Sequence, residues 1–300
     1  MHVLSLSLQK ARNRLRAWRL MSARKQRVGD NSASPDFLTP FLSRCRYCNS
    51  GESSHRLLGK VPVTFNGALE QSSYRLAQCG ECDVIYLDPE PPASDLERLY
   101  LGSSQFSVTN DLRGPQAERI ARGYARRLHY LDLLPDTVKS VLEIGAGPAW
   151  ICRAAKEHCS NVMTIAQDIS DECAAHCSWV DHYVVGNLSS LEPNGSIQLA
   201  AMTHVIEHLP KPGDFLIELA PYLAPGGKLY ITAPYRPACW RPEQGFAPWL
   251  DYSYLHVPAH ISYLSEKWMR MAAAKAGFEL VRWDVSLDGY QVLEAILERQ

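Results

Sequence analysis

Four cysteines in two closely spaced pairs are candidate metal ligands. Cys45 and Cys48 flank Arg-Tyr, and Cys79 and Cys82 flank Gly-Glu. Each pair predicts a tight turn that directs two thiolates at one point, and two such turns complete a tetrahedral shell around zinc. Because all four positions are sulfur, none stays open for water and the zinc would be structural. Redox-active pairs or plain buried cysteines are the alternatives.

A glycine turn is the candidate ligand-binding backbone. Residues 138–150 read VKSVLEIGAGPAW, which is an apolar run, a turn and the start of a helix. Gly145 lets the chain turn sharply, and Gly147 lets a ligand approach the backbone without meeting a Cβ. The helix directs free N–H groups and the positive end of its dipole toward the turn. Such turns bind nucleotide-like ligands in open α/β sheets, although an ordinary strand–helix connection is the alternative.

Asp168 ends the next predicted strand, about twenty residues after the glycine turn. A carboxylate at this place accepts hydrogen bonds from the ribose hydroxyls of an adenosine group. The alternative role is an N-cap for a helix predicted over residues 171–179, which Ser170 could cap equally well.

Histidines follow a later predicted strand, residues 197–203. The run His204-Val-Ile-Glu207-His208 matches the H-x-x-E-H pattern of inverted zinc peptidases, which hold both histidines on one helix face. A strand precedes this run and Pro210 follows it closely, so the necessary helix has little room. A peptidase is therefore only a minor alternative.

These residues need a parallel sheet to bring them together, and the chain predicts one. From Val138 apolar runs alternate with helical segments, which is typical of parallel strands with right-handed crossovers. Strands are expected from 138 to the glycine turn and over 161–168, 181–186, 197–203 and 228–233, and helices over 116–134, 171–179 and 215–223. Nearer the N-terminus, a strand over 84–87 and a helix over 95–101 follow the second cysteine pair.

Composition sets the broad class. The 300 residues carry a net charge of −1, which gives no reason to expect a nucleic-acid partner. No run of eighteen apolar residues exists that could span a membrane. Nine cysteines fit a reducing cytoplasm, with some on metal and the rest in the core. The first thirty residues hold eight basic ones. This favours a solvated, partly helical extension, and the alternatives are a helix in weak contact with a membrane surface or an organelle transit peptide.

In this order the motifs resemble those of class I S-adenosylmethionine-dependent methyltransferases. The motifs are Glu143-x-Gly145-x-Gly147, Asp168-Ile-Ser170, Glu207-His208-Leu209-Pro210, Pro225-Gly226-Gly227 and Tyr230-Ile-Thr-Ala-Pro234. The cysteine pairs are similar to the zinc-ribbon module that precedes such domains in sugar C-methyltransferases. The resemblance implies an α/β fold with a Rossmann-like doubly wound sheet, mostly parallel with an antiparallel last strand. It divides the chain into an extension and linker (1–40), a zinc ribbon (41–105) and a methyltransferase domain (106–300).

The resemblance also implies how the cofactor binds. Backbone around Gly145 and Gly147 would hold the amino-acid end of S-adenosylmethionine. Glu143 would lie beneath it and reach the cofactor ammonium directly or through water. Asp168 would bind the ribose.

Other positions are carried over in the same way. Ile169 would pack on the adenine, and Asn187 would accept a hydrogen bond from its amino group where the family often has an acid. His204 counts among the cofactor-binding residues. Gln198 stands where the family usually shows Asp.

Methyl transfer is an in-line displacement, so a base is needed only if the acceptor must lose a proton. His208 and His260 are the candidate catalytic residues, and structural histidines are the alternative. Aromatic residues in 240–254 could form an acceptor pocket or a packed lid. The predicted function is methyl transfer to a small-molecule acceptor, which could be a sugar nucleotide, a lipid-linked or a polyketide-type intermediate. A non-catalytic interaction protein is the alternative.

Overall fold

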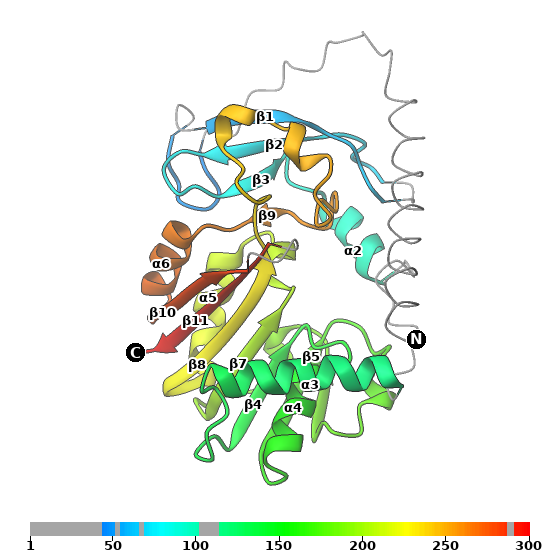
Figure 1. Cartoon of the computed structure of the whole chain (residues 1–300), viewed down its shortest axis with the longest axis vertical. Coiled ribbons are helices and arrows are strands. Elements are labelled where there is room, and N and C mark those ends of the chain that lie inside the picture. The colour runs from blue at the N-terminus through cyan, green and yellow to red at the C-terminus, as the bar shows by residue number, and fades with distance from the viewer. Residues whose placement is uncertain (1–43, 52–54, 66–68, 102–113, 287–290) are drawn as a thin grey trace, which may run out of the picture. The chain divides into compact units, whose positions relative to one another are not determined.

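A seven-stranded sheet is the largest element of this computed structural model (Figure 1). In space the strand order is β10-β11-β8-β7-β4-β5-β6. Neighbours from β8 to β6 are parallel, whereas β11 is antiparallel to both β8 and β10. This confirms the predicted Rossmann-like sheet. The strands are β4 (Ser140–Ile144), β5 (Met163–Asp168), β6 (His182–Val185), β7 (Ile197–Thr203), β8 (Leu223–Pro234), β10 (Phe278–Val285) and β11 (Val292–Arg299).

The structure describes residues 44–51, 55–65, 69–101, 114–286 and 291–300. The predicted extension and linker over 1–40 lie outside these residues, and so does the predicted domain boundary at 105/106. Residues Phe41–Gln300 belong to one compact unit, and the description below concerns that unit. Within the described part of the chain, the helices are all too short or too polar to cross a bilayer.

Helices cover both faces of the large sheet, and its central strands β4 and β7 are accordingly buried along almost their whole length. Leu142 of β4 packs in a core with residues of α5 and α6, while its neighbour Val141 packs in a separate core with α3 and α4. The helices are α2 (Ala93–Leu101), α3 (Pro115–Tyr130), α4 (Trp150–His158), α5 (Pro212–Leu219) and α6 (Glu266–Lys275). Single 3-10 turns lie at Ala174–His176, Leu188–Ser190, Ile206–His208, Ala220–Tyr222, Pro242–Gln244 and Ala247–Trp249.

The helix predicted over residues 171–179 is wrong, because this segment forms only the 3-10 turn Ala174–His176. Its side chains bind the glycine turn instead of continuing a helix. The Cys177 thiol lies 3.8 Å from the carbonyl oxygen of Gly147, and the Trp179 indole N–H donates to the carbonyl oxygen of Ala149 at 3.1 Å. These tertiary contacts outweigh the local helical preference.

A second sheet has four strands in the order β1-β2-β3-β9, with antiparallel neighbours throughout. Three of these strands come from the cysteine-rich region, but β9 comes from far along the chain and pairs Ser262 with Tyr86. The small sheet is therefore completed by a segment that follows β8. Its strands are β1 (His55–Val61), β2 (Tyr74–Cys79), β3 (Ile85–Asp88) and β9 (Ser262–Tyr263).

The aromatic segment at residues 240–254 packs mainly on this small sheet. Trp240, Trp249 and Tyr252 are buried in one core with Leu76 of β2 and Ile85 of β3. The segment is therefore chiefly a packed cover. Tyr254 also contacts two histidines, because its ring stacks on His204 and its carbonyl oxygen lies 2.7 Å from Nδ1 of His260.

Ser265 links helix α6 to the second cysteine pair. Its buried hydroxyl accepts the N–H of Trp268 at 3.0 Å and donates to the carbonyl oxygen of Cys82 at 2.5 Å. The Trp268 indole N–H donates in turn to the carbonyl oxygen of Tyr47, at 3.1 Å. Both cysteine turns are thus tied to α6.

We expect Ser265→Ala to lower the free energy of unfolding by roughly 1–3 kcal/mol, because it removes an N-cap and leaves a buried carbonyl unpaired. Urea denaturation measures this loss, and Ser160→Ala at an exposed position is the control. Equal stability of the two variants would show that the hydroxyl does not hold α6 to the cysteine turns.

Candidate functional site

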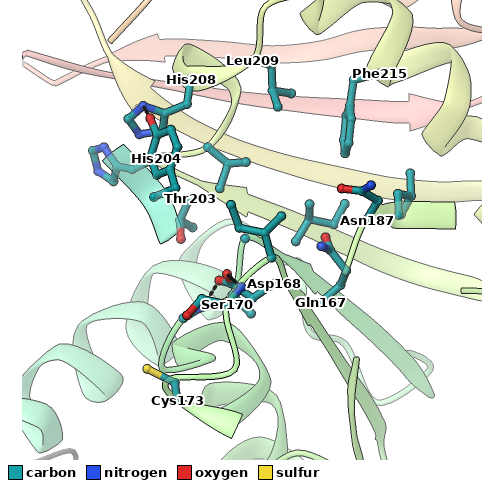
Figure 2. Close-up of a pocket in the computed structure, with 18 of the residues that line it drawn as sticks. Gln167, Asp168, Ser170, Cys173, Asn187, Thr203, His204, His208, Leu209 and Phe215 are labelled. Carbon is teal, nitrogen blue, oxygen red and sulfur yellow. Dashed lines mark hydrogen bonds between the residues drawn. The ribbon is translucent and has the colours of Figure 1, made fainter. Parts of the chain in front are cut away.

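A cavity of about 870 Å³ opens at the carboxyl ends of β4, β5 and β7. In doubly wound sheets ligands bind where the strand order reverses, and β4 lies at that point between β5 and β7. The volume is in the range of small-molecule sites. Figure 2 shows Gln167 and Asn187 at one end of the cavity and His204 with His208 at the other.

Both glycines of the turn have a positive φ, a backbone conformation that residues with a Cβ rarely adopt. Gly145 has φ +59°, and a Cβ there would lie 2.5 Å from Cγ2 of Val205. Gly147 has φ +46°, and a Cβ there would meet no described atom within 4 Å. Gly147 therefore borders open space in the cavity, as expected where a ligand approaches the backbone.

Glu143 lies under the turn and is 2% exposed. Its Oε2 accepts the backbone N–H groups of Ile151 and Cys152, both at 2.9 Å, and so satisfies two free donors at the start of α4. Burial raises the pKa of Glu143 to about 8, although these two hydrogen bonds oppose the shift. The side chain does not line the cavity, so its predicted contact with the cofactor ammonium stays a prediction.

Asp168 lines the cavity and holds the turn in place. Its Oδ2 accepts the N–H of Gly147 at 2.7 Å, and its Oδ1 accepts the N–H of Ser170 at 2.9 Å (Figure 2). The carboxylate thus organises the backbone around the cavity. Its predicted contact with a ribose remains untested.

Three further residues predicted to bind the cofactor line the cavity, whereas Gln198, the departure from the family pattern, does not. Ile169 and Asn187 line the cavity, and Ile169 is 45% exposed, as an apolar surface for an adenine would be. His204 also lines it, and has φ +56°, an uncommon conformation for a residue with a Cβ. Gln198 does not line it, because its Oε1 accepts the N–H of Lys139 near the start of β4.

The histidine end of the cavity includes a tyrosine from outside the motifs. His208 lines the cavity, and its Nδ1 lies 2.8 Å from the carbonyl oxygen of Ala259 and 2.7 Å from the hydroxyl of Tyr100. Tyr100 comes from α2 and lines the cavity as well. No sequence pattern marks Tyr100, since only the fold brings α2 beside the end of β7.

His260, the other predicted catalytic residue, lies behind His208 with ring centroids 5.0 Å apart, and it does not line the cavity. Its Nδ1 lies 2.7 Å from the carbonyl oxygen of Tyr254. Burial, with a smaller effect of His208, lowers the pKa of His260 to about 3. His260 is therefore neutral near pH 7.

Glu207 is fully buried between these histidines. Burial alone would raise the pKa of Glu207, but the neighbouring His208 and His204 outweigh burial and lower the pKa. Its Oε1 lies 3.5 Å from Nδ1 of His204 and 3.8 Å from Nε2 of His208. The segment forms one 3-10 turn, Ile206–His208, rather than the helix that a zinc peptidase needs.

The four paired cysteines come together as predicted. Their sulfurs all lie within 4.8 Å of one another, with Cys45–Cys82 at 3.9 Å and Cys48–Cys79 at 3.6 Å. Zn–S bonds of about 2.3 Å in a tetrahedron place sulfurs about 3.8 Å apart, so the donor set fits zinc.

Both cysteine turns use the same backbone device. Asn49 and Asp83, each directly after the second cysteine of its pair, have φ of +63° and +60°. Each donates its N–H to the carbonyl oxygen of the first cysteine, at 2.7 and 2.8 Å.

Comparison with known proteins identifies the class. A family model described as a methyltransferase domain matches residues 116–282, more than half of the chain, so the chain belongs to this family. A similar solved structure is the 1,6-didemethyltoxoflavin-N1-methyltransferase of Burkholderia thailandensis with bound 1,6-didemethyltoxoflavin and S-adenosylhomocysteine. It is 17% identical with a TM-score of 0.50, over 80% of this chain and 100% of that one. No curated protein matches the sequence.

A second similar structure is an S-adenosylmethionine-dependent methyltransferase of Mesorhizobium loti, 17% identical with a TM-score of 0.47, over 60% of this chain and 100% of that one. The family and the sheet order together define a class I S-adenosylmethionine-dependent methyltransferase, and S-adenosylmethionine is its cofactor. The family match favours this enzyme over the non-catalytic interaction protein.

Glu143 gives a pH-dependent prediction. Its pKa of about 8 in the folded chain exceeds the value of 4.5 expected when it is exposed. Between these pH values the folded chain binds more protons than the unfolded one, so folding stability falls as the pH rises. Glu143→Gln keeps an oxygen acceptor and removes the titration. Between pH 5 and pH 8 the free energy of unfolding should fall in both proteins. We expect the fall to be roughly 2–4 kcal/mol smaller in the variant than in the wild type.

Urea denaturation of the cofactor-free protein at both pH values measures the difference. Glu97→Gln, at an exposed position on α2, should retain the wild-type profile. Parallel profiles for Glu143→Gln and the wild type would contradict a buried titrating carboxyl.

Proposed function

We propose that the cavity binds S-adenosylmethionine at the end formed by the glycine turn and a small-molecule acceptor at the end formed by His204 and His208. The observation that carries this proposal is the single cavity that joins Gly147 and Asp168 to His208. In this arrangement Gly145 and Gly147 hold the amino-acid end of the cofactor, and Asp168 binds its ribose. Ile169 packs on the adenine, and the side-chain oxygen of Asn187 accepts a hydrogen bond from the adenine amino group.

The charges of the cavity support an acceptor without phosphate. Its described lining includes Asp168, Glu172 and Glu218 but no lysine or arginine. A nucleotide or lipid diphosphate calls for cationic partners. An uncharged acceptor such as a polyketide-type intermediate therefore fits better than a sugar nucleotide or a lipid-linked one.

The acceptor's proton, where one must leave, would go to His208. In its neutral form with the hydrogen on Nδ1, directed at the carbonyl oxygen of Ala259, the ring keeps a lone pair on Nε2. The buried carboxylate of Glu207 would stabilise the imidazolium that forms. His260 would act through His208 as a positioning residue, since it does not line the cavity.

Asp168→Ala tests the cofactor end. We expect its dissociation constant for S-adenosylmethionine to rise roughly 10- to 100-fold, because a charge-assisted hydrogen bond of ~1.5–3 kcal/mol is lost. Isothermal calorimetry measures the constant, and Asp171→Ala, exposed and outside the cavity lining, is the control. An unchanged affinity would refute the ribose assignment, and no binding by the folded wild type would overturn the proposed function.

We also propose that Cys45, Cys48, Cys79 and Cys82 hold a structural zinc ion. The hydrogen bond with Cys82 lowers the pKa of Cys45 to about 5, against the effect of burial, so a thiolate is favoured there. With no open coordination position this zinc would stabilise the small sheet and take no part in methyl transfer.

Cys45→Ser combined with Cys48→Ser should remove this zinc and lower the melting temperature by more than about 10 °C, because such a site contributes ~10–16 kcal/mol to its module. Cys159→Ser combined with Cys239→Ser is the matched control, since neither residue belongs to the four-sulfur cluster. Metal analysis and calorimetry give the two readouts. Retention of thiolate-bound zinc by the first variant would refute the assignment.

A further inference from the structure

Three polar side chains behind the histidine end of the cavity converge on one point. An oxygen of Glu207 and one ring nitrogen each of His208 and His260 lie within 4.8 Å of one another. Glu207 is 0% exposed and His260 is 6% exposed, and only His208 lines the cavity. The group joins the turn after β7 to the loop before β9, two segments far apart in the sequence.

The Glu207 carboxylate has histidine rings near it, with Oε1 3.5 Å from Nδ1 of His204 and 3.8 Å from Nε2 of His208. Neither of its oxygens receives a hydrogen bond from the described residues. A buried polar group without a hydrogen bond is costly, and a buried carboxylate more so, unless a cation or donor compensates it. Its surroundings therefore favour a positive charge beside Glu207.

In both imidazoles Nδ1 is engaged by a backbone carbonyl oxygen, which leaves Nε2 as the ring nitrogen available to a ligand. Nδ1 of His208 lies 2.8 Å from the carbonyl oxygen of Ala259, and Nδ1 of His260 lies 2.7 Å from that of Tyr254. Since a carbonyl oxygen only accepts, each Nδ1 carries a hydrogen, and in the neutral form of each ring Nε2 then keeps a lone pair. Histidines that bind metal through one nitrogen commonly donate the other N–H to a backbone carbonyl in this way.

We infer that Glu207, His208 and His260 form a metal site for a divalent cation, separate from the four cysteines. Two imidazoles and one carboxylate suit Zn²⁺, Co²⁺ or Fe²⁺ better than Mg²⁺, which prefers oxygen ligands and retains water. In a tetrahedral zinc site the ligand atoms lie about 3.4 Å apart. The Oε1–Nε2 distance of 3.8 Å between Glu207 and His208 is close to this spacing, and all three ligand atoms lie within 4.8 Å of one another.

This ligand set differs from that of the H-x-x-E-H motif. The peptidase pattern uses the first and last histidine of His204–His208, whereas here His260 replaces His204. His204 is 37% exposed, and its ring stacks on Tyr254. The site thus depends on a loop that the sequence places fifty-two residues after His208, and its ligands come from two turns.

The cation and the proposed base role of His208 compete for the same Nε2 lone pair. Metal-loaded His208 cannot accept a proton, so the metal state of the cluster would control the base. Metal binding itself does not depend on the proposed methyl transfer, and a metal count therefore tests the site whether or not the acceptor proposal holds.

The test counts metal in the full chain after stripping with a chelator and reloading with Co²⁺. We expect two Co²⁺ per chain in the wild type. Glu207→Gln and His260→Gln should each retain one Co²⁺, which has the thiolate-to-metal charge-transfer absorption of a cysteine site. Cys45→Ser/Cys48→Ser should retain one Co²⁺ without that absorption. His129→Ala, exposed at the end of α3, is the control and should bind two.

A second measurement guards against misfolded variants. Zn²⁺ titration of the wild-type chain, with the cysteine site already filled, should shift the ring resonances of His208 and His260 in NMR spectra and not those of His129. One Co²⁺ per wild-type chain, or two in Glu207→Gln, would overturn the inference. So would ring spectra that show His208 doubly protonated beside Glu207 and insensitive to Zn²⁺.

Discussion

The buried carboxylate of Glu143 is the interaction on which the cofactor pocket depends. It lies at the end of β4 and accepts the N–H groups that begin α4, so strand and helix are joined across the glycine turn. Gly145 must then take a left-handed conformation, and its missing Cβ leaves room for Val205. Asp168 adds the second tie, from β5 to Gly147. With both carboxylates in place the turn is rigid and its free edge faces the cavity.

The cysteine-rich sheet is structurally continuous with the methyltransferase fold. Strand β9 completes it, and Ser265 and Trp268 of α6 bond to the carbonyl oxygens of Cys82 and Tyr47. Sulfurs of the cysteine cluster belong to the same buried core as Leu142 of β4. A metal held by these cysteines would therefore stabilise the loop that carries His260 as well as the small sheet.

Charge is distributed unevenly along the cavity. At the glycine turn, carboxylates are satisfied by backbone N–H groups, which leaves them fixed in position. At the other end Glu207 has imidazoles for neighbours and no hydrogen bond from the described residues. The first arrangement suits the binding of a cofactor, because the donors and acceptors are already oriented. The second holds a buried carboxylate beside titratable imidazoles, which is the arrangement from which we inferred a cation site.

Amino-acid order alone was enough to predict the parts of the molecule whose chemistry is local. Residue types at fixed spacing defined the two cysteine turns, the glycine turn and Asp168, and the alternation of apolar runs with helical segments defined the sheet and its class. Local pattern failed at residues 171–179, where side chains of Cys177 and Trp179 bind the glycine turn and prevent a helix.

Which distant residues come into contact became visible only in the folded chain. Nothing in the pattern around Tyr100 indicates that it lies 2.7 Å from His208, because the contact depends on where α2 packs. The same holds for β9, and for His260 beside Glu207, since both follow from the path of one long loop. Hydrogen bonding and burial between such segments depend on how the whole sheet packs, so the spacing of residues along the chain does not predict them.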